Sequence, residues 1–155
     1  MKAIPVLLCA LLGSLVLVGG IQAKTSKAAG VSCHRINAKG VGQDLGGGNT
    51  TANIIGGGLL QGTTAAHFDI VGFSPPVATI AGTVKFTTNQ ATLTVALSGT
   101  FNVATGSFSA TGPVTGATGK LAGATGSLSF AGVEDLSTGS FTETIDGSIC
   151  VDLAP

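Results

Sequence analysis

Residues 91–101 read ATLTVALSGTF and alternate apolar with polar side chains along almost their whole length. The larger apolar side chains fall on one face: Leu93, Val95, Leu97 and Phe101. The intervening side chains fall on the other: Thr92, Thr94, Ala96, Ser98 and Thr100. A period of two is typical of a β-strand with one buried face. This stretch therefore predicts β-structure.

The same alternation recurs along the chain. It is strong in 127–133 and 141–151 and weaker in five further segments: 31–41, 50–55, 63–73, 77–87 and 107–111. Clusters of Gly, Pro, Asn and Asp separate these segments, as turns require. No segment of useful length has helical periodicity. The sequence predicts an all-β protein of about eight short antiparallel strands.

Composition sets outer limits on the class of protein. The chain has 155 residues, which suits one domain, and it is 44% hydrophobic but only 9% charged. Low charge with this hydrophobicity argues against disorder. A formal net charge of zero provides no field to attract nucleic acid or an anionic membrane. We expect neither as a partner.

The N-terminal residues have the pattern of a secretory signal peptide. Lys2 precedes an apolar run over 4–18, and a small residue, Ala23, ends the segment. An alternative cleavage follows Ala28 or Ala29, and an uncleaved membrane anchor is the other interpretation. Cys9 follows three large apolar residues, so lipidation is not expected. We expect 1–23 to be the signal, 24–30 a flexible N-terminus, 31–155 one β-barrel domain, and the mature protein exported and free of the membrane.

Two cysteines remain once the signal is removed. Cys33 and Cys150 lie near the two ends of the mature domain, and an even number in an exported chain suggests one disulfide. Closing so long a loop would stabilise the fold by about 4–5 kcal/mol on the chain-entropy argument. Two independent buried thiols are the alternative. Two thiols without metal-ligand spacing do not indicate a zinc site, and we expect no metal.

A closed barrel and a β-sandwich both accommodate these strands. Closure removes the sheet edges that strands so poor in charge would leave unprotected. In an up-and-down barrel the first and last strands are neighbours, so Cys33 can face Cys150 there. That register keeps polar and apolar sets matched. Its further pairs are Arg35 with Ser148, Asn37 with Asp146, His34 with Ile149, Ala38 with Ile145 and Gly40 with Glu143.

A short echo marks two hairpin loops. The segments 103–111 and 136–144 share Thr-Gly-Ser-Phe, and each follows an Asn or Asp, Asn102 and Asp135. We expect Gly106 and Gly139 to supply positive φ and the Asn or Asp side chains to bond nearby backbone. Two copies are too few for a solenoid.

Residues 113–126, PVTGATGKLAGATG, resemble a segment of dirigent proteins and allene oxide cyclases. The matching positions are Pro113, Val114, Gly116, Thr118, Gly119, Lys120, Ala124 and Gly126. Leu121 replaces the usual aromatic residue, Ala117 the usual second glycine, and Thr125 the Arg of plant dirigent proteins. The flanking sequence looks like small exported bacterial proteins of unassigned function. The resemblance implies an eight-stranded barrel that works on a small molecule without a cofactor, and it transfers no site residue.

Within the motif itself we expect Pro113 to end a strand and the glycines to form an irregular connection. A phosphate-binding loop is excluded, because Leu121 follows the Lys and the glycine spacing is wrong.

Glu143 is the sharpest candidate for chemistry. It shares the predicted inner face with Phe141, Ile145 and Ile149, where burial would raise its pKa. A twist that turns it into solvent is the alternative. The candidate ligand-binding residues are Glu143, His34, Phe141 and Ile145, although His34 also reads as a core histidine. His67 and Asp69 share the polar face of one strand, where exposure is the plainer interpretation.

Two functions remain open from the sequence. The first is an exported barrel that binds a small apolar or phenolic molecule in its lumen and has cofactor-free cyclase, isomerase or coupling-steering activity. The second is a structural or envelope protein with a packed interior. An eight-stranded barrel allows both, so the interior volume discriminates between them. The sequence decides neither whether the protein is an enzyme nor whether it forms a homo-oligomer.

Overall fold

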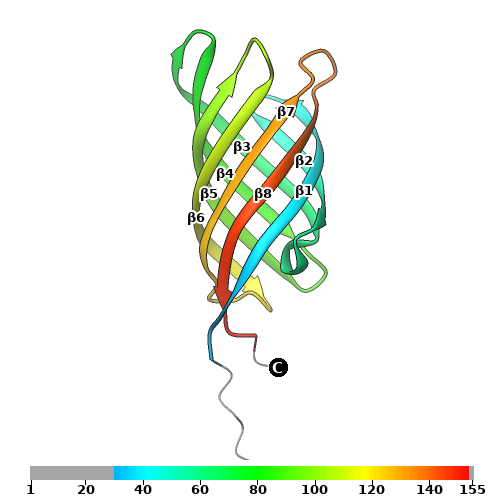
Figure 1. The fold of residues 1–155 in the computed structure, drawn as a ribbon, viewed down its shortest axis with the longest axis vertical. Coiled ribbons are helices and arrows are strands. Elements are labelled where there is room, and N and C mark those ends of the chain that lie inside the picture. The colour runs from blue at the N-terminus through cyan, green and yellow to red at the C-terminus, as the bar shows by residue number, and fades with distance from the viewer. Residues whose placement is uncertain (1–29, 154–155) are drawn as a thin grey trace, which may run out of the picture.

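The computed structural model describes residues 30–153, which form a closed barrel of antiparallel strands (Figure 1). The strands follow one another around the barrel: β1 (Ser32–Gly46), β2 (Asn49–Gly56), β3 (Gly62–Ser74), β4 (Val77–Thr87), β5 (Ala91–Asn102), β6 (Ser107–Gly119), β7 (Thr125–Glu134) and β8 (Ser140–Val151). The predicted all-β class, strand number and closure are confirmed, and the sandwich alternative is wrong. The predicted signal peptide, 1–23, and residues 24–29 lie outside the described residues.

Pairing between β1 and β8 closes the barrel. Cys33 lies opposite Cys150, and the register continues without a shift to Gly40 opposite Glu143 and beyond. The two cysteines form a disulfide across a sequence separation of 117. Both the predicted register and the predicted disulfide are confirmed. The register could be predicted because apolar residues of β1 and β8 must share the inner face.

The predicted end of a strand at Pro113 is wrong. β6 continues through Pro113 to Gly119 and β7 begins at Thr125, so only 120–124 of the glycine-rich motif form the connection. Gly112 and Pro113 of β6 have no paired residue on β5. The register between these two strands also shifts between Thr94 and Val95. An irregular ladder tolerates a proline, which has no N–H to donate. β1 is likewise longer than predicted.

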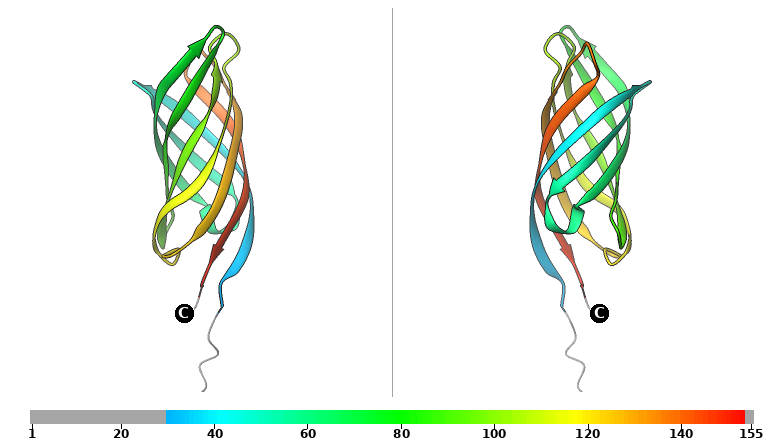
Figure 2. Two further views of the ribbon diagram at one scale, coloured as in Figure 1. Left: turned by 90° about the vertical axis from the view of Figure 1, so that its left-hand side faces the viewer. Right: turned by 90° about the vertical axis from the view of Figure 1, so that its right-hand side faces the viewer.

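The two loops that share the Thr-Gly-Ser-Phe sequence are equivalent hairpin turns, as predicted. Gly106 has φ +73° and Gly139 φ +71°. Asn102 Oδ1 accepts a hydrogen bond from the Ala104 backbone N–H at 2.9 Å. Asp135 Oδ1 accepts one from the Ser137 N–H, also at 2.9 Å. Both loops lie at the end of the barrel opposite the chain ends (Figures 1 and 2).

The interior is tightly packed toward the end that carries the two chain ends. We call this region the packed half and define it by eight of its side chains, each at most 2% exposed: Ile36, Leu60, Phe86, Leu93, Leu121, Leu128, Ile149 and Val151. Two come from connections, Leu60 from the 3₁₀ helix η1 (Gly58–Leu60) and Leu121 from the β6–β7 turn. Figure 2 shows η1 at this end of the barrel. These two side chains plug this end of the barrel interior, which the strand residues alone would leave open.

Candidate functional site

A cavity of about 300 Å³ occupies the other half of the barrel interior. Most of its wall is apolar, and five of its side chains are phenylalanines: Phe68, Phe101, Phe108, Phe130 and Phe141. The polar side chains in the wall are Asp44, Thr50, Thr64, Glu134 and Glu143. We call this region the cavity half. Its volume lies at the lower end of the range for small-molecule sites.

The cavity extends to the end of the barrel formed by the hairpin loops. Gly48 of the β1–β2 loop and Leu136 of the β7–β8 loop contribute to its wall. Ile70 also lines it although the side chain is 67% exposed. An inner-face residue with that exposure marks a mouth, so a ligand can enter between the hairpins.

Glu143 projects from the first third of β8 beside two glycines. Its partner on β1 is Gly40 and its partner on β7 is Gly132. A Cβ at position 40 would lie 2.5 Å from Glu143 Oε1 and 2.6 Å from its Cγ. The glycine therefore provides the space into which the Glu143 side chain folds.

The Glu143 carboxyl has no protein partner within residues 30–153, since it makes neither a hydrogen bond nor an ion pair there. Burial raises its pKa to about 7. At neutral pH the protonated and ionised forms are therefore both populated. The group can donate a hydrogen bond in one form and accept one in the other, as a ligand anchor or a general acid or base requires.

An aromatic pair stands next to Glu143. The rings of Phe108 and Phe141 meet edge to face, with their centroids 5.9 Å apart and an interplanar angle of 85°. Each ring lies over a glycine, Phe108 over Gly132 and Phe141 over Gly42, where a Cβ would collide with the ring. Glycines in the wall thus let large rings fit into a narrow barrel and leave free volume between them.

Two further carboxyl groups lie nearer the mouth. Glu134 is the last residue of β7, and Asp44 lies near the end of β1. Burial and the neighbouring charge of Asp44 raise the pKa of Glu134 above its usual value. No Lys, Arg or His is among the residues that line the cavity. The charged side chains in the cavity wall are therefore all acidic.

Thr64 supplies the one buried polar side chain found within residues 30–153. Its hydroxyl has no hydrogen-bond partner in that part of the chain, and the residue lines the cavity. No enclosed side-chain nitrogen or oxygen atom in residues 30–153 lacks a partner, so the Thr64 oxygen is open to the cavity space. Thr64 is therefore a second group that a ligand could satisfy.

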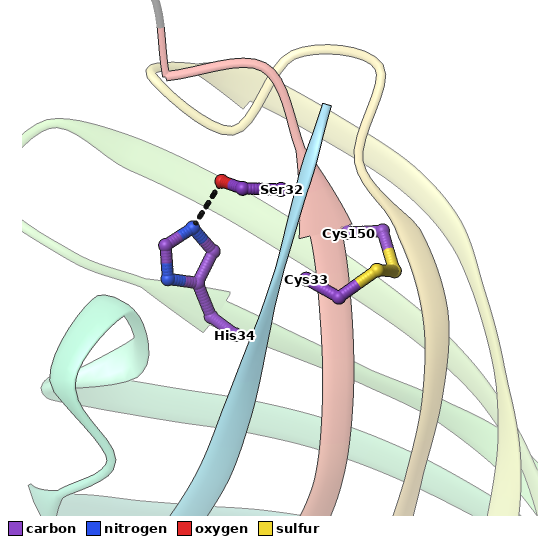
Figure 3. Close-up of a disulfide and its surroundings, with 4 residues drawn as sticks. All are labelled: Ser32, Cys33, His34 and Cys150. Atoms are coloured by element: carbon purple, nitrogen blue, oxygen red, sulfur yellow. Dashed lines mark hydrogen bonds between the residues drawn. A yellow bond between two sulfur atoms is a disulfide. The ribbon is translucent and has the colours of Figure 1, made fainter. Parts of the chain in front are cut away.

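The structure brings together two of the four predicted ligand-binding residues. Glu143 and Phe141 line the cavity. Ile145 is fully buried in the core and is not part of the cavity wall. His34 also lies away from it, in the packed half, where its Nε2 is 2.8 Å from Ser32 Oγ (Figure 3). The ring lies on the opposite side of β1 from the disulfide. Alternation had identified the correct face but not the height along the barrel.

The His67–Asp69 pair lies on the outer wall, as expected. The side chains are 53% and 76% exposed, and His67 Nε2 is 3.6 Å from Asp69 Oδ1. Asn49 Oδ1 lies 3.1 Å from the other ring nitrogen. Across residues 30–153, no three His, Cys, Asp or Glu side chains gather to hold a metal ion. Within the same range no helix has the length and hydropathy to cross a membrane.

Sequence reasoning missed Asp44, Thr64, Glu134 and Phe108. Asp44 and Glu134 lie beyond the predicted ends of their strands, 31–41 and 127–133. Carrying each alternation onward would have placed both on the inner face. Thr64 and Phe108 lay within predicted strands, but only the arrangement of all eight strands shows that they line one space.

Comparisons of the chain with protein-family models, with curated proteins and with solved structures found no match. The resemblance to dirigent proteins and allene oxide cyclases stays a prediction from the sequence.

Proposed function

We propose that this protein binds a small, mainly apolar molecule inside the barrel and that Glu143 is its polar anchor. One observation carries the proposal: a cavity of about 300 Å³ with a largely apolar wall contains a carboxyl group that has no partner within residues 30–153. A few polar groups in an apolar pocket are typical of small-molecule sites.

The cost of leaving such a space empty supports this proposal. Protein interiors are normally packed to the density of organic crystals, and voids lose stability. The packed half shows that this chain fills its interior where large aliphatic side chains are present. The cavity half instead keeps free volume and a half-buried carboxyl that has no protein partner among residues 30–153. A bound molecule would offset both.

A catalytic role is an extension of the same proposal. A carboxyl group with a pKa of about 7 suits proton transfer near neutral pH. It could support cofactor-free cyclisation or isomerisation, or the cavity could orient phenolic radicals for coupling, as in the families that the sequence resembles. The competing structural or envelope role needs a filled interior, and the cavity favours binding over that role.

We further propose that the protein is exported. The Cys33–Cys150 disulfide supports this, because disulfides persist mainly in oxidising compartments. The N-terminal pattern from which the sequence predicts a signal peptide lies outside the described residues. Locating the mature protein in a fractionated host would test the proposal.

Ligand-dependent thermal stability tests the binding function directly. A screen of neutral phenols and short alkylbenzenes should raise the melting temperature of the wild-type protein. Ala66→Leu adds volume to the cavity wall and should abolish the shifts while the protein stays folded. The matched control is Ala131→Leu on the exposed outer face of β7. The binding proposal fails if no probe stabilises the wild type, or if both variants respond as it does.

A further inference from the structure

The charges around the cavity all have one sign. Titratable side chains face it from three strands, Asp44 of β1, Glu134 of β7 and Glu143 of β8, and the other strands contribute none. The Lys and Arg residues in the described part of the chain are all exposed: Arg35, Lys39, Lys85 and Lys120. Within residues 30–153, no Lys or Arg side chain is therefore placed to neutralise a carboxylate inside the barrel.

The arrangement of these charges is graded along the entry route. Asp44 and Glu134 lie near the mouth, and Glu143 lies further along β8 toward the packed half. A cleft lined by one sign of charge and bounded by apolar walls concentrates the opposite charge. An anion meets like charges from the mouth inward, whereas a cation is attracted along the same path.

The aromatic wall favours the same kind of ligand. Five phenylalanines line the cavity, and a phenyl ring offers a cation the negative face of its π-system without any competing hydrogen-bond donor. Phe108 and Phe141 form their edge-to-face pair beside Glu143. An ammonium group placed there would meet a carboxylate and aromatic rings together.

We infer that the ligand is an apolar molecule that carries a basic nitrogen, held by Glu143 against the phenylalanine wall. The inference rests on the proposed binding function and narrows its ligand class. A void of about 150 Å³ accommodates benzene, so about 300 Å³ takes a ring with a short alkyl chain. Arylalkylamines have that size, and they are protonated at neutral pH as lysine is.

An isosteric series separates charge from shape. Isothermal titration calorimetry at pH 8 would compare 4-phenylbutylamine, 4-phenylbutanol and 4-phenylbutyrate with the full folded protein. We expect the amine to bind at least about tenfold more tightly than the alcohol, and the carboxylate to show no binding. If the alcohol or the carboxylate binds as tightly as the amine, the binding function stands and the basic-nitrogen inference falls. If none of the three binds, both fall.

A variant pair tests the role of Glu143. Glu143→Gln removes the charge where burial already disfavours it, so the fold should survive, as circular dichroism would verify. Amine affinity should fall at least about tenfold and alcohol affinity by less than about threefold. Asp146→Asn makes the same change on the exposed face of β8 and should leave both affinities unchanged. An unchanged amine affinity in Glu143→Gln would overturn the inference.

The pH profile provides an independent readout. Wild-type affinity for the amine should rise between pH 6 and 8 as Glu143 loses its proton. In Glu143→Gln that rise should disappear, leaving any dependence that arises from Glu134, whose pKa is also raised. A rise of the same size in both proteins would show that Glu143 is not the partner of the nitrogen.

Discussion

The two halves of this barrel share the same eight strands but use their inner faces differently. The packed half fills its space with Leu, Ile and Val side chains and one phenyl ring, and Leu60 and Leu121 close it from two connections. The cavity half places phenyl rings over glycines and adds three carboxyl groups. Stability and binding are thus assigned to opposite ends of one barrel. A rigid scaffold at one end can hold a site at the other that is less than fully packed.

Removing one phenyl ring from each half should give the largest difference in stability between the two halves. Phe86 is fully buried in the packed half, and Phe86→Ala should lower the free energy of unfolding by about 3–5 kcal/mol. Phe108 is half-buried beside the cavity, and Phe108→Ala should cost only about 1–2 kcal/mol because its ring already borders free volume. Urea denaturation measures both. Equal losses would show that the two halves are equally packed.

The disulfide is the next largest contribution, and it belongs to the packed half. Replacing both Cys33 and Cys150 with Ser should lower the free energy of unfolding by about 2–4 kcal/mol. Ligand affinity should stay unchanged, because the bridge lies away from the cavity wall. Reducing agent added to the wild type should reproduce the loss and should not affect the double variant. A change in affinity would show that the two halves are coupled.

Stability should depend on pH through the cavity half. Folding raises the pKa of Glu143 to about 7, above its usual value of 4.5, so the folded state binds the proton more tightly. The free energy of unfolding should therefore be highest below pH 4.5 as far as this group is concerned, fall as pH rises to about 7, and then level off. The fall should be about 1–3 kcal/mol.

The control for this profile is Glu143→Gln, measured by denaturation across the same pH range. The variant should lose most of the fall between pH 4.5 and 7. A smaller fall of the same sign should persist, because the pKa of Glu134 is also raised. Superimposable profiles of variant and wild type would mean that Glu143 is more hydrated than the structure indicates.

The smallest expected effect comes from a methyl group beneath Glu143. Gly40→Ala would place a Cβ 2.5 Å from Oε1 and push the carboxyl away, which should cost about 1–2 kcal/mol. Gly116→Ala is the matched control, since the nearest atom to its new Cβ would lie 3.8 Å away. It should change stability by less than about 0.5 kcal/mol. Ligand affinity should fall in the first variant alone.

The sequence predicted the barrel well because a strand's alternation and its pairing carry the same information. Once Cys33 was placed opposite Cys150, the matched rows left one register, and it led directly to Gly40 opposite Glu143. The prediction that a strand ends at Pro113 was wrong because a proline is usually excluded from a strand interior. Here β6 continues past Pro113, which has no paired residue on β5.

The site was harder to predict than the fold. Glu143, Ile145 and Ile149 share one face, yet one lines the cavity and two belong to the core. The height of a residue along the barrel axis determines whether it lines the cavity or packs in the core. That height depends on the stagger of all eight strands. Alternation within a single strand does not contain that information, so His34 and Ile145 were grouped with a site that they do not reach.

The Cys33–Cys150 bridge also changes the topology of the molecule. It joins neighbouring strands that lie near the two ends of the domain, so the covalent path around the barrel forms a ring of backbone closed by one sulfur–sulfur bond. A single protease cut in any hairpin at the mouth would open this ring without releasing a fragment. The cavity rim could be nicked, or supplied with new ends by circular permutation, while the wall stays covalently continuous.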